Sequence, residues 1–287
     1  MISSQTRESF ARWTSFWREY SKHRGAVIGL GVITAMITVS ALAPYVAPFD
    51  PEEITVDRWL PPSSHHLMGT DNMGRDVLSR TIWGGRISLF IGFVAATIAI
   101  LVGVLIGAMA GYFGGKLDDL LMRLTDGFMV IPTFFLVLLI VSMFGSTTFN
   151  IMIVLGLTSW PETARVARAE FLSLSKMEFI DAARVLGAGD LRIMFFHILP
   201  NAFPPILVAL SMRVAGAILN EAALSFLGLG DINVITWGQM LHGAIRYMAL
   251  GWWMAVFPGL CIFFTVLAFN IIGDGLTDAL NPRLRHR

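Results

Sequence analysis

Charged side chains are scarce in this sequence. Only 14% of its 287 residues are Asp, Glu, Lys or Arg, and 55% are hydrophobic, whereas about 25% of the residues in soluble domains are charged. The mean hydropathy is +0.67. Too few polar side chains are present to cover a water-facing surface, so most of the surface must face lipid. The composition therefore excludes a soluble fold and predicts a membrane protein.

Cysteine, net charge and nucleotide-binding motifs are also sparse. The single cysteine, Cys261, excludes an intramolecular disulfide framework and a cysteine-based zinc site. A net charge of +1 gives no electrostatic reason to expect nucleic acid as a partner. The adjacent His65 and His66 do not share a helical face, so we expect no metal site. The glycines of Gly114–Lys116 are followed by Leu117 and lack the spacing of a P-loop, so we expect no ATP hydrolysis by this chain.

Long apolar runs, by contrast, are abundant in this sequence. A helix that spans a bilayer needs about 20 mostly apolar residues. Six segments meet this requirement approximately: Gly25–Ala47, Ile87–Phe113, Phe128–Phe144, Phe149–Val166, Ala202–Leu227 and Ala249–Ile272. We expect the first to be retained as an anchor, because no convincing cleavage site follows it. The sequence thus predicts an all-α polytopic membrane protein with six transmembrane helices.

The basic residues predict the orientation of these spans. Residues 1–24, 116–123, 165–192 and 283–287 hold fifteen Lys and Arg on one side, against five on the other. Cytoplasmic loops carry the excess of Lys and Arg, so both termini are predicted to be cytoplasmic. The predicted parts are a cytoplasmic tail (1–24), a first transmembrane helix (25–47), an extracytoplasmic loop with an interfacial helix (48–86), a five-helix core (87–275) and a cytoplasmic tail (276–287).

The cytoplasmic segment 167–200 within the core is long for a six-helix protein, in which connections of 2 to 8 residues are usual. Its composition predicts a helix up to Leu186, a break at Gly187–Gly189, and a second helix with Asp190 as its N-cap. In the first helix, Phe179, Ala182, Ala183 and Leu186 have the spacing of one face. Two short helices joined by a sharp turn would form a projection suited to docking.

This segment carries a family resemblance. Asp181-Ala182-Ala183, Gly187 and Leu199-Pro200 resemble the EAA loop of ABC-importer permeases, which inserts into a cleft of the ATPase subunit. The sequence departs from the usual pattern where Asp181 replaces a glutamate and where His197 replaces a frequent isoleucine. The first change keeps the negative charge. The second places a polar residue at this position, and in this respect the sequence is similar to members of the peptide and nickel branch of the family.

Three further segments extend the resemblance over nearly the whole chain from Gly25. Residues 66–80 resemble the outer-loop signature of dipeptide, oligopeptide and nickel permeases, and residues 221–230 and 268–282 resemble two further blocks of that family. A single N-terminal span followed by this outer loop is most similar to the C-type permease of the pair. The resemblance implies a type I ABC importer permease (MetI-like) fold.

The same resemblance implies a non-catalytic role in import of di- or oligopeptides across the bacterial inner membrane. The implied partners are a second homologous permease, two cytoplasmic ATPase subunits that bind ATP and Mg, and an extracytoplasmic solute-binding protein, with no cofactor in this chain. The implied ATPase-coupling residues are Glu178, Phe179, Asp181, Ala182, Ala183, Arg184, Gly187, Leu199 and Pro200.

Charged residues inside spans are candidates for function. Arg213 lies near the middle of the predicted fifth span, and Glu221 lies about 12 Å further along its axis. Arg213 either faces the translocation path, which we also considered for Glu221, or forms a structural ion pair, for example with a carboxylate of the partner subunit. At the outer face, Asp71, Gly74, Arg75 and Asp76 either help to close an outer gate, or contact the binding protein, or only cap the bundle.

Gly103, Gly107, Gly111 and Gly115 form a ladder with one small residue every fourth position. Such ladders allow helices to approach closely. The ladder therefore predicts either a seam with the partner permease or tight packing within the chain.

Three other functions stay open at this point. An importer of nickel, metal chelates or glutathione shares the same scaffold. An ion-coupled secondary transporter usually has internal repeats and midplane acidic sites, which are not apparent in this sequence. A membrane enzyme would need a cluster of catalytic or metal-binding side chains within the spans.

Overall fold

The structure is a computed structural model that describes residues 16–280. Five of the basic residues used to predict the orientation lie outside the described residues: Arg7, Arg12, Arg283, Arg285 and Arg287. The described part is mostly helical. Its helices are α2 (Arg24–Ala41), α3 (Ala43–Val46), α4 (Val77–Phe113), α5 (Gly115–Val130), α6 (Thr133–Phe144), α7 (Thr148–Thr158), α8 (Trp160–Leu174), α9 (Glu178–Val185), α10 (Asp190–Arg192), α11 (Leu199–Leu224), α12 (Trp237–Ala244) and α13 (Trp253–Leu280). The all-α class is confirmed.

The spans agree with the prediction in number only approximately. Four continuous helices of residues 16–280 are long and apolar enough to cross a membrane: Arg24–Ala41, Val77–Phe113, Asp190–Leu229 and Trp253–Leu280. The pair α5–α6 makes a fifth if its two helices count as one bent span. The segment predicted as the fourth span is divided between α7 and α8. Six spans are therefore consistent with the structure, although two of them are interrupted.

Proline explains both interruptions. The helices α5 and α6 meet at a bend of 80°, where Ile131 is extended (φ −83°, ψ 122°) because the residue before Pro132 disfavours the helical region. Between α7 and α8, Ser159 leaves helical geometry (φ −102°, ψ 3°) and Pro161 stands in the first turn of α8. Pro161 has no N–H to continue the hydrogen bonds of α7.

The predicted boundary between the outer loop and the core is corrected by α4. This helix begins at Val77 rather than at Ile87, so the interfacial helix expected within 48–86 is the first part of α4 itself. The Asp76 carboxylate accepts a hydrogen bond of 2.7 Å from the Ser79 N–H and thereby caps the helix. No proline interrupts α4, which ends at Gly114, whose φ is 64°.

The glycine ladder packs within the chain. A Cβ atom on Gly103 would lie 2.6 Å from Thr163 Cβ, on Gly107 2.2 Å from the Ala164 carbonyl oxygen, and on Gly111 2.5 Å from the Arg168 carbonyl oxygen. All three neighbours belong to α8. A seam with a partner permease is therefore wrong for these three positions, whereas Gly115 meets nothing within 4 Å.

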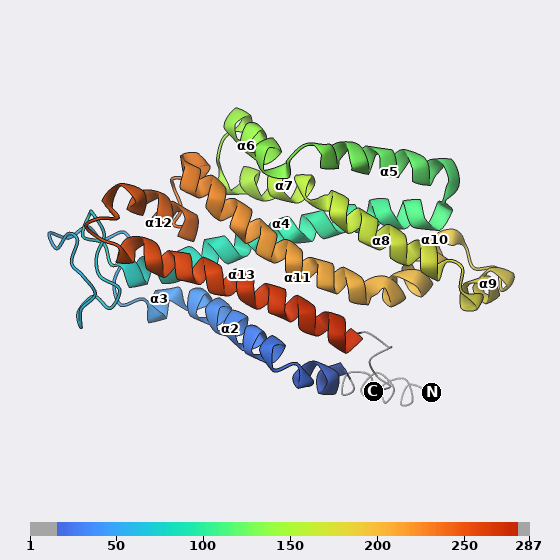
Figure 1. The fold of residues 1–287 in the computed structure, drawn as a ribbon, viewed down its shortest axis with the longest axis horizontal. Coiled ribbons are helices and arrows are strands. Elements are labelled where there is room, and N and C mark those ends of the chain that lie inside the picture. The colour runs from blue at the N-terminus through green and yellow to red at the C-terminus, as the bar shows by residue number, and fades with distance from the viewer. Residues whose placement is uncertain (1–15, 281–287) are drawn as a thin grey trace.

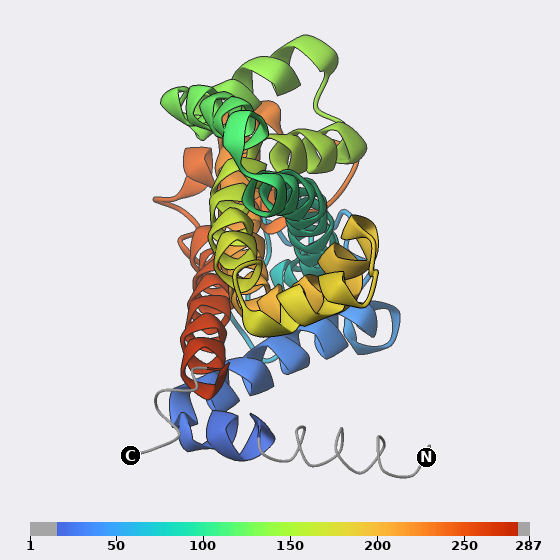
Figure 2. The same cartoon turned by 90° about the vertical axis from the view of Figure 1, so that its right-hand side faces the viewer.

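The bundle is elongated, and its two ends differ (Figure 1). The segment between α3 and α4 lies at one end together with α12, while α9 projects from the other end, toward which α2 begins and α13 finishes. Viewed along the bundle, α5 and α6 lie on one flank and α2 lies on the opposite flank (Figure 2). The helices α4, α8, α11 and α13 occupy the middle, where the buried cores include Ile218, Ala96 and Phe269.

Candidate functional site

The projection at the end of the bundle is formed by α9 and the turn that follows it. The Gly187 N–H donates to the Arg184 carbonyl (2.9 Å), and the Ala188 N–H donates to the Ala183 carbonyl (3.0 Å). This pair of bonds is the Schellman motif, which needs a left-handed residue after the helix. Gly187 supplies it with φ 81°. The break predicted at Gly187 is confirmed.

The face of α9 that the sequence assigned is corrected in part. Ile180 is fully buried and Ala183 is 8% exposed, whereas Leu186 is 86% exposed. Phe179 and Ala182 are exposed as well. Ile180, which the sequence analysis did not single out, anchors α9 against the buried Ile193 and Ile198. The residues of α9 thus divide into a buried pair, Ile180 and Ala183, and an exposed set.

A polar link joins the projection to α4. The Tyr112 hydroxyl donates to Asp190 Oδ1 (2.7 Å), and the Arg184 guanidinium lies 5.8 Å from the centre of the Tyr112 ring. Arg184 also pairs with Asp181 (3.1 Å). Asp190 is therefore not an N-cap: the cap position belongs to Gly189. Tyr112 is separated from Asp190 by 78 positions, and no local pattern in the sequence marks it.

The residues at the end of segment 167–200 continue into a span. Leu199 and Pro200 open α11, directly after a π-helical turn, Ile193–Ile198. Pro200 has no N–H for the regular helical bond to the preceding turn, which favours wider spacing there. The projection is thus joined rigidly to α11 as well as to α4.

A cavity of about 790 Å³ lies between α8, α11 and α13. Arg213 from α11 and Glu162 from α8 form an ion pair at its wall, so the partner of Arg213 belongs to the same chain. The pair also lines a neighbouring cavity of about 270 Å³. Glu170, one turn short of the end of α8, lines the larger cavity. Partial burial raises the pKa of the Glu170 carboxyl.

The structure does not bring Glu221 to the cavity. Glu221 is 1% exposed and accepts a hydrogen bond of 2.7 Å from the Ser225 hydroxyl. Trp237, from α12, lies nearby, and its backbone N–H donates a hydrogen bond to the Ser88 hydroxyl (3.1 Å). Glu221 therefore belongs to the packing at the end of α11 beside α12 rather than to the wall of the cavity.

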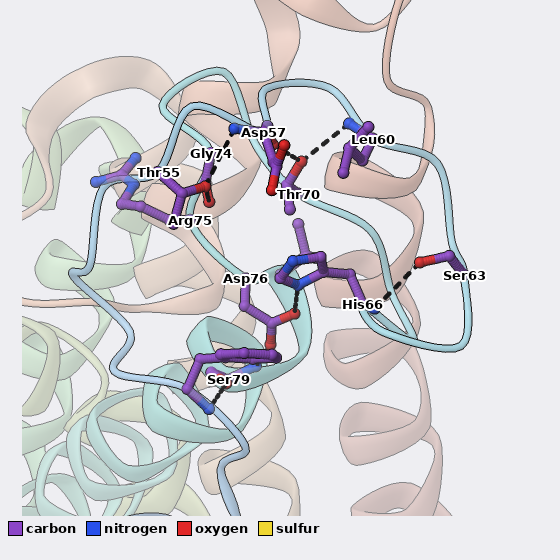
Figure 3. Close-up of polar contacts among 12 residues, drawn as sticks. Thr55, Asp57, Leu60, Ser63, His66, Thr70, Gly74, Arg75, Asp76 and Ser79 are labelled. Atoms are coloured by element: carbon purple, nitrogen blue, oxygen red, sulfur yellow. Dashed lines mark hydrogen bonds and ion pairs between the residues drawn. The ribbon is translucent and has the colours of Figure 1, made fainter.

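The outer-loop residues form a compact polar core (Figure 3). Asp76 pairs with the buried His66 (Nδ1 to Oδ1, 2.8 Å) in addition to capping α4. Asp71 accepts from Arg75 Nε at 2.7 Å. Gly74 has φ 80°, and a Cβ there would lie 2.4 Å from the Thr55 carbonyl oxygen. Asp71 and Asp76 are buried, so their hydrogen bonds and ion pairs stabilise the fold of this loop.

Replacing Asp76 with alanine is expected to lower the melting temperature of the purified protein by several degrees. The change removes a helix cap, at a cost of about 1 kcal/mol, and leaves buried His66 without its partner, at about 1–3 kcal/mol. Asp57→Ala is the matched control, because Asp57 is an exposed carboxylate of the same loop. An Asp76→Ala protein with the same melting temperature as the Asp57→Ala control would contradict this assignment.

Comparison with known proteins covers almost the entire chain. Residues 99–286 match the family described as "Binding-protein-dependent transport system inner membrane component", and residues 11–62 match the "N-terminal TM domain of oligopeptide transport permease C". The dipeptide transport system permease protein DppC of Haemophilus influenzae is 40% identical over 278 residues, which is 94% of each chain. The glutathione transport system permease protein GsiD of Pectobacterium atrosepticum is 39% identical over 95% of this chain and 92% of its own.

Solved structures confirm the fold. A chain of the MetNI methionine ABC transporter, described as inward facing, matches 71% of this chain and 97% of its own with a TM-score of 0.56. The sequence identity is 19%, so this likeness concerns the fold alone. It agrees with the MetI-like fold that the sequence predicted.

Proposed function

Because this chain belongs to the family of binding-protein-dependent transport system inner membrane components, we propose that it is the permease subunit of an ABC importer for di- or oligopeptides. The observation that carries this proposal is the 40% identity to a dipeptide permease across 94% of both chains. A second relative is named for di- and tripeptides, at 39% identity. The chain itself is a multi-pass inner-membrane subunit without a catalytic role.

The importer would need partners that hydrolyse ATP and deliver the substrate. We propose a second homologous permease, two cytoplasmic ATPase subunits carrying ATP and Mg, and an extracytoplasmic binding protein. In this arrangement α9 and both termini face the cytoplasm, as the excess of basic residues favours. The opposite end of the bundle, with Asp71, Gly74, Arg75 and Asp76, would face the binding protein. There the buried carboxylates hold the loop, and Arg75 lines a small cavity beside α12.

The exposed face of α9 supports ATPase docking at that end. Val185 is 88% exposed, Leu186 86% and Phe179 43%, which leaves an apolar patch on a short projecting helix. Glu178 and Asp181 stand beside it in the first turn. An amphipathic helix with such a patch suits a groove in a partner. Movement of the ATPases would pass through α9 to α4 and α11, because α9 is tied to both.

Tyr112→Phe is expected to reduce the ATPase stimulation by loaded binding protein several-fold. The change removes the hydrogen bond to Asp190 but keeps the ring near Arg184, so the projection should move less tightly with α4. The measurement is ATP turnover of the reconstituted complex with and without binding protein. Tyr45→Phe is the control, because Tyr45 is 87% exposed at the other end of the bundle. Equal stimulation in the two variants would count against a coupling role for Tyr112.

Reconstitution tests the proposed function itself. Proteoliposomes with both permeases, the ATPases and the binding protein should accumulate labelled dialanine only when ATP and binding protein are present. Uptake driven by an ion gradient without ATP would instead indicate a secondary transporter. Competition by glutathione or by a nickel chelate identifies the alternative substrates, of which glutathione is favoured by the relative named for it.

A further inference from the structure

The Glu162–Arg213 pair occupies a special position, because it lines both the cavity of about 790 Å³ and the neighbouring cavity of about 270 Å³. The smaller cavity reaches the bend between α5 and α6 and the break between α7 and α8. The larger one extends along α8 and α11 to Thr277 and Leu280 at the end of α13. The ion pair therefore stands where the two cavities meet.

Two further polar groups of the larger cavity lack partners. Glu170 has no hydrogen bond or ion pair within residues 16–280, and its carboxylate lines the cavity. Thr163 also lines it, is 1% exposed, and has a hydroxyl without a hydrogen-bond partner among the described residues. A buried hydroxyl without a partner is destabilising, and the partly buried Glu170 carboxylate has no counter-charge beside it in the part of the chain that the structure describes. The wall of the cavity thus carries polar groups that a polar ligand would pair with.

The charges have the arrangement of a site for a zwitterion. Arg213 supplies a cationic guanidinium, which pairs with the Glu162 carboxylate in this structure. Glu170 supplies a carboxylate that has no partner within residues 16–280. Glu162 and Glu170 are eight residues apart on α8, which is about 12 Å along the helix axis. An extended peptide advances about 3.4 Å per residue, so three to four residues cover this separation.

On the basis of the proposed function, we infer that this cavity binds a peptide of three to four residues by its two ends: the free amino terminus at Glu170 and the free carboxylate at Arg213. The peptide carboxylate takes the place of Glu162 on the guanidinium. Opening of the Glu162–Arg213 pair by the substrate then joins the two cavities. Arg213 and Glu162 determine specificity for the carboxyl end, and Glu170 for the amino end.

Binding to the purified complex of permeases and ATPases, without binding protein, tests this site. Equilibrium dialysis with labelled tetraalanine should give about tenfold weaker binding to Glu170→Gln. N-acetyl-tetraalanine should bind the unaltered complex about tenfold more weakly, and should lose nothing further in Glu170→Gln, because the two changes remove the same contact. Glu53→Gln, an exposed carboxylate of the outer loop, is the matched control.

Glu162→Gln is expected to act in the opposite direction. Loss of the competing carboxylate should strengthen tetraalanine binding several-fold, and this gain should be missing for tetraalanine amide. The inference is overturned if the losses from Glu170→Gln and N-acetylation multiply, if Glu162→Gln binds no more tightly than Glu53→Gln, or if the unaltered complex binds no tetraalanine. ATP-dependent dialanine uptake by the same complex, after its reconstitution into proteoliposomes with binding protein, separates these failures from failure of the proposed function.

Discussion

Replacing Gly187 with arginine is expected to abolish transport while leaving the protein in the membrane. The substitution puts a side chain at φ 81°, which costs about 1–3 kcal/mol outside glycine, at the turn that ends α9. Nothing in residues 16–280 lies within 4 Å of a Cβ there, so under the proposed function the added bulk would meet the docked ATPase. We expect at least a tenfold loss of stimulated ATP turnover and of dialanine uptake, with an unchanged yield of inserted protein.

Two control variants separate backbone strain from bulk. Asparagine tolerates the left-handed region, so Gly187→Asn should keep most of the activity. Gly189 has φ −73° and also meets nothing within 4 Å, so Gly189→Ala should behave as the unaltered protein. Normal uptake by the Gly187→Arg complex would show that the turn after α9 does not dock.

Gly107→Val is expected to prevent assembly of the bundle altogether. A Cβ at Gly107 would lie 2.2 Å from the Ala164 carbonyl oxygen and 2.8 Å from Ala167 Cβ, and both neighbours belong to the rigid helix α8. Backbone atoms cannot move aside singly, so α4 and α8 would have to separate along their length. Overpacking of this kind costs about 3 kcal/mol or more.

The measurement is the yield and melting temperature of the detergent-purified protein. Gly216→Val is the matched control, since Gly216 lies in α11 and has nothing within 4 Å of its Cβ position. We expect near-normal yield for the control and almost none for Gly107→Val. Similar yields for the two variants would mean that α4 does not pack on α8 as closely as described.

The glycine ladder illustrates what the sequence left undecided. A small residue at every fourth position requires a close neighbour, but the identity of that neighbour is not encoded in the spacing. The structure places α8 against Gly103, Gly107 and Gly111. The same limit applies to Arg213, whose need for a carboxylate was evident, while its partner Glu162 lies 51 positions away.

The face of α9 shows a second kind of limit. Helical spacing assigned Phe179, Ala182, Ala183 and Leu186 to one face of a short helix, but the structure buries only Ala183 of the four. Periodicity alone cannot distinguish the side that packs on its own chain from the side left exposed. Ile180 decides this, because it packs with Ile193 and Ile198. The remaining apolar side chains are then left exposed.

The scarcity of charge, the length of the apolar runs and the turn at Gly187 determined the class of protein, its approximate spans and the end of α9. These are local properties, since transfer to lipid and backbone conformation depend on residues close together in the chain. Only the tertiary structure decided where α4 begins, which helix the glycines meet, and that Glu162, Glu170 and Arg213 share one cavity. Such pairings depend on which helices become neighbours, and that is settled by packing of the whole bundle rather than by any one segment.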